Sequence, residues 1–173
     1  RIPSITLRAS RSVIVVPGYG MAQAHAQLET VQLGEILARM GKQVRFAVHP
    51  VAGRMPGHMH VLLAEAGVDP DTLLDITEIN SDFSSTDVAL IVGACDVVNP
   101  AAITQPGTPI SGMPILNAHE ARHAVVCNLD RRPGYSGVEN SLYAEPATIF
   151  LEGDAKVTLR RLFETLQPPA SAV

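Results

Sequence analysis

The stretch Ser12-Val13-Ile14-Val15-Val16-Pro17-Gly18-Tyr19-Gly20 decides the fold of this chain. Residues 12–16 predict a strand without polar alternation, as in a parallel sheet that is covered on both faces. Gly18 and Gly20 follow immediately, and a helical pattern begins behind them. Strand, glycine turn and helix in this order are typical of the first unit of a dinucleotide-binding α/β domain.

The glycine turn is the strongest local signal for a bound phosphate. A sharp turn needs glycine, and the missing side chain lets a pyrophosphate approach the backbone. The start of the helix adds free N–H groups and the positive end of the helix dipole. The motif continues as Met21-Ala22-Gln23, so G-x-G-x-x-Q lacks the third small residue of the dinucleotide fingerprint. A tight turn without a ligand is the alternative, but the position between strand and helix favours ligand binding.

Away from this turn, apolar runs alternate with helical stretches and Gly/Pro punctuation. Strands are predicted at residues 43–48, 72–77 (the weakest), 88–92, 124–127 and 148–151, and helices at residues 22–40, 59–66 and from the Asp154 cap to about residue 166. This alternation predicts an α/β fold with a doubly wound parallel sheet. The long connections at residues 99–114 and 129–146 are of the kind that is either functional or disordered.

Length and charge limit the class of protein. The 173 residues fit one domain, which we expect over residues 12–167, with a linker at residues 1–11 and a disordered tail at residues 168–173. The formal net charge is −4 and no basic run occurs, so no nucleic-acid partner is expected. The longest apolar runs, such as residues 88–92, are far shorter than the roughly 20 residues that a membrane span needs, so we expect no direct membrane insertion of this domain.

Neither a metal site nor covalent catalysis is predicted. Cys95 and Cys127 follow apolar runs and are expected to be buried free thiols. His119 and His123 are spaced i, i+4 but lack a third ligand. No G-x-S-x-G motif occurs.

The end of the second predicted strand lacks a residue that an ordinary NAD fingerprint contains. An acidic side chain is expected there to hold the ribose hydroxyls, but residues 46–50 are Phe-Ala-Val-His-Pro. Either the cofactor is phosphorylated or its adenosine end lies elsewhere.

Several segments between residues 12 and 166, in order and at natural spacing, resemble one family. The most specific is His49–Met59 (HPVAGRMPGHM), and the others are Pro17–Ala22, Val61–Glu65, Glu78–Asn80, Gly93–Asp96, Asn99–Ala102, Gly112–Pro114, Gly134–Tyr135 and Gly153–Lys156. Together they resemble the NADP(H)-binding domain of proton-translocating NAD(P) transhydrogenase, which is the C-terminal part (domain III) of the beta subunit.

The resemblance implies a Rossmann-like sheet of six parallel strands with helices on both faces. It also implies a dinucleotide bound in reversed orientation, which explains the missing carboxylate after the second strand. Residues 128–135 match a lid that folds over the nucleotide. The implied cofactor contacts are Gly18, Tyr19, Gly20, Met21, Ala22, Val51, Ala52, Gly53, Arg54, Met55, Pro56, Gly93, Ala94, Cys95, Asp96, Val97, Gly112, Met113, Asn128, Leu129, Asp130, Arg131, Arg132, Pro133, Gly134, Tyr135, Asp154 and Ala155.

The chemistry that the resemblance implies is direct hydride transfer between NADP(H) on this domain and NAD(H) on a partner domain. The nicotinamide ring carries that reaction, so no catalytic acid, base or nucleophile is expected. The family also implies a membrane domain, a role for Asp96 in coupling to it, and a peripheral position on the cytoplasmic or matrix face of an energy-transducing membrane. A loop-capping role for Asp96 is the alternative.

The sequence departs from the family where the 2′-phosphate of NADP is held. Members carry a Lys-Arg-Ser triplet there; without a gap those positions are Asn128, Leu129 and Asp130. Asp130 would repel a phosphate and suit the ribose hydroxyls of NAD(H). A gap in the alignment instead matches Arg131 and Arg132 with the cations and restores NADP(H) binding.

Two smaller departures concern activity. Cys95 replaces the usual Asn beside Asp96, and Gln23 replaces a small apolar residue. A divergent NAD(H)-binding or nucleotide-sensing module without transhydrogenation is therefore the alternative function.

Overall fold

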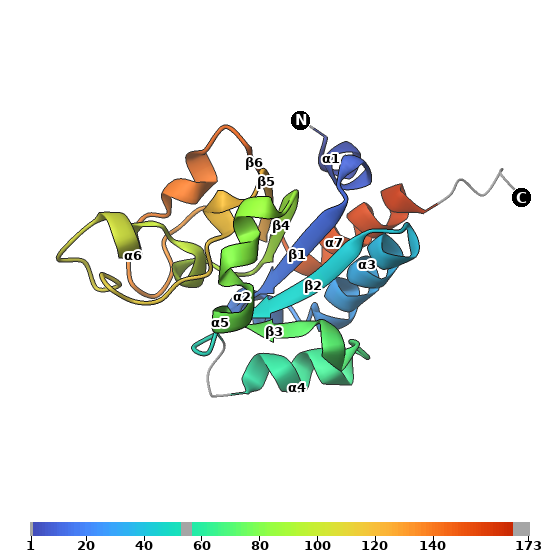
Figure 1. The fold of residues 1–173 in the computed structure, drawn as a ribbon, viewed down its shortest axis with the longest axis horizontal. Coiled ribbons are helices and arrows are strands. Elements are labelled where there is room, and N and C mark those ends of the chain that lie inside the picture. Colours follow the sequence, from blue (N-terminus) through green and yellow to red (C-terminus); the bar gives the residue numbers. More distant parts are fainter. Residues whose placement is uncertain (1, 53–56, 168–173) are drawn as a thin grey trace, which may run out of the picture.

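The computed structural model describes residues 2–52 and 57–167. Six parallel strands form one sheet in the order β3-β2-β1-β4-β5-β6 (Figure 1). The strands are β1 (Ser12–Pro17), β2 (Gln43–Val48), β3 (Leu73–Asp75), β4 (Val88–Val92), β5 (His123–Asn128) and β6 (Thr148–Glu152). The strand order reverses between β1 and β4, as in a doubly wound dinucleotide-binding sheet. The predicted α/β Rossmann-like sheet is confirmed.

The longer helices cover one face of the sheet. Val13 and Val15 of β1 point into this layer together with Leu90 of β4. Their partners come from α3 (Gln27–Arg39), α4 (His58–Glu65) and α7 (Ala155–Leu166), of which α3 and α7 lie side by side (Figure 1). The side-chain alternation of a strand sends the intervening residues to the other face.

Short helical turns cover the second face. Ile14 and Val16 of β1 pack there against Phe83 and Leu116, which are fully buried. The elements on or near this face are α5 (Ile76–Ile79), η2 (Asn80–Ser85), η3 (Asp96–Val98), α6 (Ala101–Thr104), η4 (Ala118–Glu120) and η5 (Ser141–Ala144), while η1 (Pro70–Thr72) precedes β3. Because these turns are short, side-chain hydrogen bonds hold them in place.

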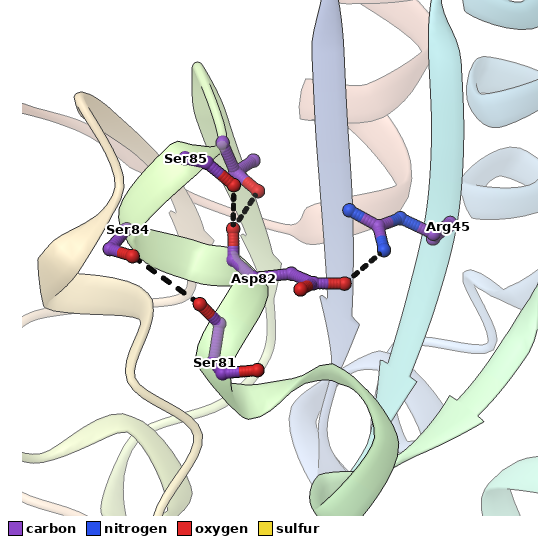
Figure 2. A network of polar contacts seen from close by, with 6 residues as sticks. Arg45, Ser81, Asp82, Ser84 and Ser85 are labelled. Atoms are coloured by element: carbon purple, nitrogen blue, oxygen red, sulfur yellow. Dashed lines mark hydrogen bonds and ion pairs between the residues drawn. The ribbon is translucent and has the colours of Figure 1, made fainter.

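Figure 2 shows one such network at η2. Arg45 extends from β2 and donates to the Asp82 carboxylate over 2.6 Å. The backbone carbonyl of Asp82 accepts from the hydroxyls of Ser85 and Thr86 at 3.1 and 2.7 Å. The network fastens η2 against β2 near the edge of the sheet.

The predicted helix over residues 22–40 is wrong at its start, because the chain forms two helices. α2 (Tyr19–Gln23) ends before His25, which adopts a left-handed φ of 52° that a helix cannot contain. Met21 and Ala26 are both fully buried. In one continuous helix these two side chains would point about 140° apart, so the break lets both enter the core.

Residues 3–9 form helix α1 (Pro3–Ala9), although a linker was predicted there. Leu7 is fully buried, and Arg8 donates to the carbonyl of Thr165 in α7 at 2.6 Å. Lys42 donates to the carbonyls of Arg8 and Ser10, each at 2.7 Å. A seven-residue segment with one core residue shows no helical periodicity, so the sequence pattern could not reveal this docking.

Other predicted boundaries hold to within a few residues. The weak strand at residues 72–77 is shortened to β3 because Asp75 and Glu78 form a capping box that starts α5. The predicted tail at residues 168–173 lies outside the described residues. Within those described, no helix combines the length and apolar character of a membrane span.

Candidate functional site

A cleft of about 1240 Å³ opens at the carboxyl ends of β1, β4 and β5. This edge is the switch point of the sheet, where open α/β folds bind ligands. The volume exceeds the roughly 300–1,000 Å³ of ordinary small-molecule pockets, as an extended ligand requires. Its lining residues are Gly18, Tyr19, Gly20, Gln23, Val51, Ala52, Gly93, Ala94, Cys95, Asp96, Val97, Pro109, Ile110, Met113, Asn128, Leu129, Asp130, Arg132, Pro133, Gly134, Tyr135 and Ser136.

The glycine turn packs directly on the loop after β4. The amide of Gly18 donates to Val92 O at 2.9 Å and that of Gly20 to Gly93 O at 2.8 Å. A side-chain carbon on Gly18 would lie 2.4 Å from Gly93 O. The amide of Met21 is also bound, to Gly18 O at 3.0 Å, and α2 has only five residues. These three amides therefore serve the turn itself, and are not the free N–H groups that the sequence predicted.

Asn128, at the end of β5, fixes the loop after β4. Its side-chain oxygen accepts from the Gly93 amide at 3.0 Å. Its nitrogen donates to Ala94 O and to the Tyr143 hydroxyl, both at 2.9 Å. The residue is 8% exposed, and burial also raises the pKa of Tyr143. The amide of Asn128 thus shapes the wall of the cleft and is already hydrogen-bonded within the protein.

Asp96 joins the loop after β4 to the segment that follows the predicted lid. Its two carboxylate oxygens accept from the Ser136 hydroxyl at 2.7 Å and the Ser136 amide at 3.0 Å. Asn140 donates from its side chain to Cys95 O at 3.0 Å. Asn99 donates to two further carbonyls of the same segment. Residues 136–140 are therefore anchored to the loop after β4 and its continuation.

The two candidate phosphate-binding arginines point to different places. Arg132 lines the cleft and donates to Asp130 through its amide at 2.9 Å, Nε at 2.9 Å and Nη2 at 2.8 Å. These hydrogen bonds lower the pKa of Asp130. Arg131 instead stacks 4.3 Å from the centroid of the Phe150 ring and donates to Tyr143 O at 3.4 Å. It does not line the cleft.

His49 joins the segment after β2 to the residue that follows Met113. Its Nδ1 accepts from the Val51 amide at 3.1 Å, so its proton lies on Nε2, which donates to Pro114 O. The ring is 2% exposed. Desolvation in this position lowers the pKa of His49.

The buried His49 makes stability depend on pH. The pKa of His49 in the folded chain lies below the ordinary 6.5 of the unfolded chain. As the pH falls, the unfolded chain therefore takes up a proton before the folded chain does. The contribution of His49 to the free energy of unfolding is full above pH 6.5 and decreases as the pH drops below it. The slope stays below about 1.4 kcal/mol per pH unit for one proton. Urea unfolding between pH 5 and 8 should show a smaller slope for His49→Gln than for the unmodified chain. His60→Gln, at an exposed position of α4, should keep the original slope; equal slopes for all three chains would contradict this role.

Most predicted contacts meet at the cleft, and some do not. Met21, Ala22, Gly112, Arg131, Asp154 and Ala155 do not line it. Asp154 caps α7, as predicted, by accepting from the amides of Lys156 and Val157. Gly53, Arg54, Met55 and Pro56 lie outside the described residues. Lining residues that the predicted contacts lacked are Gln23, Pro109, Ile110 and Ser136.

Sequence motifs gave little signal for those missed residues. Pro109 and Ile110 belong to the long connection at residues 99–114 and to no motif there. The only signal for them was that long loops in a compact domain are often functional. Ser136 directly follows the predicted lid, so a lid predicted one residue longer would have included Ser136.

The two cysteines are free thiols in different surroundings. Cys127 is fully buried in the core, which raises its pKa to about 12. Cys95 lines the cleft half-buried, and burial raises its pKa as well. Within residues 2–52 and 57–167, no three His, Cys, Asp or Glu side chains are grouped to hold a metal ion.

Comparisons with solved structures extend the fold assignment. A putative thiamin diphosphate-dependent enzyme isolated from Mycobacterium smegmatis matches with a TM-score of 0.56 and 19% identity, over 99% of this chain and 28% of that one. A Sir2 homologue mutant in a 2′-O-acetyl ADP ribose complex matches with a TM-score of 0.54 and 13% identity, over 95% of both chains. At these identities the likeness shows the fold alone.

Sequence comparisons are more specific. The family model for the NAD(P) transhydrogenase beta subunit matches residues 3–165. The NAD(P) transhydrogenase subunit beta of Rhodospirillum rubrum is 46% identical over 160 residues, which are 92% of this chain and 34% of that protein. The chain thus spans about a third of the length of that curated relative. From this agreement over nearly its whole length, the chain belongs to the NAD(P) transhydrogenase beta subunit family.

Proposed function

We propose that this chain is the NADP(H)-binding component of a proton-translocating transhydrogenase, and that it exchanges hydride directly with NAD(H) held by a partner domain. The observation that carries the proposal is the long cleft at the switch point of the sheet. It unites the glycine turn, which the residues themselves predicted to bind a phosphate, with the loop after β4 and the lid, which the family resemblance implied as cofactor contacts. Family membership supports the same assignment.

The residues of the cleft suit a dinucleotide. Gly18, Gly20 and Gly93 line it, so that backbone rather than side chains faces the space there. Charged side chains also line it, at Asp130 and Arg132. A bound nicotinamide would supply the hydride, and the chain would orient it and exclude water. With Asp96 bound to Ser136, a coupling role for this carboxylate would run through that contact.

Exposed apolar side chains around the cleft support the proposal that a partner domain binds there. The side chains of Val51, Leu129 and Tyr135 line the cleft and are 62%, 69% and 106% exposed. Exposed apolar groups around a ligand site are typical of a surface that another protein covers. In the proposed enzyme that protein is the NAD(H)-binding domain, and a membrane domain completes the assembly. The chain would then lie peripherally, on the cytoplasmic or matrix face of an energy-transducing membrane.

A second candidate function is an NAD(H)-binding or nucleotide-sensing module without transhydrogenation. The observation in its favour is the carboxylate of Asp130 in the cleft, where the family carries a triplet with two cations. A carboxylate at this place suits a ribose diol better than a phosphate.

Mixing experiments separate the two functions. The chain would be combined with an NAD(H)-binding transhydrogenase domain, NADPH and an oxidised NAD analogue whose reduction is followed by absorbance. Turnover that needs both proteins supports the hydride-transfer component. Nucleotide binding by calorimetry without turnover supports the module, and the absence of binding to either nucleotide would contradict both.

Tyr135→Ala is expected to speed the release of NADP(H) roughly 10-fold, because an aromatic ring over a ligand contributes on the order of 1 kcal/mol beyond its buried area. The ring is fully exposed in the free chain and lines the cleft, so it is placed to cover a ligand. Stopped-flow displacement would measure the rate. Ile103→Ala, which removes an apolar side chain 65% exposed outside the cleft, is the matched control. Equal rates in the two variants would remove Tyr135 from the lid.

A further inference from the structure

We infer that Arg132, oriented by Asp130, is the residue of this chain that recognises the 2′-phosphate of NADP(H). The inference rests on the proposed function and deepens it, because it assigns the choice between NADP(H) and NAD(H) to one pair of side chains. It rejects the alignment without a gap, because Asn128 takes no part, and of the gapped alignment it keeps Arg132 but not Arg131.

The charges that line the cleft favour Arg132 as the phosphate ligand. A phosphate monoester is close to a dianion at neutral pH, and charge-assisted hydrogen bonds from a guanidinium are its strongest protein partners. Among the described residues that line the cleft, Arg132 is the single Lys or Arg side chain. The carboxylates that line it are Asp96 and Asp130. Asp96 uses both oxygens on Ser136.

The ion pair between Arg132 and Asp130 leaves part of the guanidinium open to a ligand. Asp130 accepts from Nε and Nη2 of Arg132, so the Nη1 edge of the fork is left toward the solvent. The side chain of Arg132 is 82% exposed and that of Asp130 is 33% exposed, so the guanidinium lies on the outer side of the pair. A phosphate can reach that open edge while Asp130 stays bound. The carboxylate holds the planar fork in place, which reduces the freedom that the arginine loses on binding.

The neighbouring side chains are already occupied by contacts within the protein. Arg131 stacks on Phe150 and donates to Tyr143 O, away from the cleft. The amide of Asn128 is bound on both sides by backbone and by Tyr143. Asp130 already accepts three hydrogen bonds from Arg132, which leaves it poorly placed to take the two hydroxyls of an NAD ribose.

Calorimetry of NADPH and NADH binding to four chains tests the inference. Arg132→Gln should weaken NADPH binding roughly 10- to 100-fold, the range of a lost charge-assisted contact, and leave NADH binding within about 2-fold. Arg131→Gln should leave the NADPH-to-NADH ratio unchanged. Arg122→Gln controls for net charge, because Arg122 is 78% exposed beside the amino end of β5, opposite the cleft.

Asp130→Asn tests the positioning role. The amide still accepts from the Arg132 backbone but loses the ion pair, so NADPH binding should weaken about 3-fold while NADH binding stays unchanged. A gain in NADPH affinity would mean that Asp130 acts by repulsion, and it would overturn the positioning role. Weaker NADH binding with NADPH unchanged would assign Asp130 to the ribose and overturn the inference.

The remaining outcomes separate the inference from the proposed function. If the unmodified chain prefers NADPH and Arg132→Gln keeps that preference, the inference fails and the proposed function stands. If the unmodified chain binds NADH as tightly as NADPH, phosphate recognition fails and the second candidate function gains support. If it binds neither nucleotide, both fail together.

Discussion

Gly93→Ala is expected to destabilise the chain by roughly 3–5 kcal/mol and to abolish nucleotide binding. A side-chain carbon at Gly93 would lie 2.1 Å from the amide nitrogen of Met21 and 2.4 Å from the carbonyl carbon of Gly20. Both are backbone atoms, so relief requires the glycine turn to move away from β4. That movement breaks the 2.8 Å bond from the Gly20 amide to Gly93 O and reshapes the cleft floor.

A second glycine separates the clash from the backbone conformation. Gly93 has a φ of +67°, and Gly107 has a φ of +79° but meets no atom within 4 Å. Gly107→Ala should therefore cost only about 1 kcal/mol, the ordinary penalty for a left-handed alanine. Urea unfolding of both variants measures the difference, with nucleotide binding as the second readout. Similar losses in the two variants would show that the close approach to the turn is unimportant.

The contact between the glycine turn and Gly93 shows which features of the fold the sequence predicts and which it does not. The pattern of residues 12–20 predicted a strand, a tight turn and a helix, because burial on both faces leaves a β-branched run and a sharp turn needs glycine. It could not show that Gly93, 73 positions beyond Gly20, is the surface on which the turn packs. Such a requirement is set by backbone contacts across strands, which leave no local pattern.

Helices were less predictable than strands for a physical reason. A central strand such as β4 is buried at every position, and its boundaries were predicted as the structure has them. The break between α2 and α3 depends on Met21 and Ala26 both reaching the core, which only the packed structure reveals. The docking of α1 depends likewise on Arg8 and Lys42, two exposed-looking cations.

The candidate site was predictable by segment but not by side-chain direction. Loops at the carboxyl ends of strands gather at one edge, so the cleft followed from the order of motifs. The directions of Asn128 and Arg131 follow from partners elsewhere, at Tyr143 and Phe150, whereas Arg132 is held by its neighbour Asp130. A one-residue step along the chain therefore separates an arginine in the cleft from one on an aromatic ring.

Asn128→Ala is expected to destabilise the chain by about 2–3 kcal/mol and to weaken nucleotide binding with it. The change removes three hydrogen bonds at a position that is 8% exposed, to the Gly93 amide, to Ala94 O and to the Tyr143 hydroxyl. Part of the loss is limited because the Gly93 amide also donates to Cys127 O at 3.0 Å. Urea unfolding at pH 7.5 and nucleotide calorimetry measure the two effects.

Asn128→Asp should be more damaging than Asn128→Ala, although its shape is nearly the same. One carboxylate oxygen still accepts from the Gly93 amide, but the other replaces the amide nitrogen, so the carbonyl of Ala94 loses its donor and faces a negative oxygen. A buried charge beside a carbonyl is destabilising, so the Asp variant should recover stability relative to Ala as the pH falls and the group is protonated. Asn117→Ala, at a half-buried position outside the cleft, should change stability by no more than about 0.5 kcal/mol. If Asp at position 128 is tolerated better than Ala at pH 7.5, the donor role of Asn128 is wrong, and the wall of the cleft after β4 is held by other contacts.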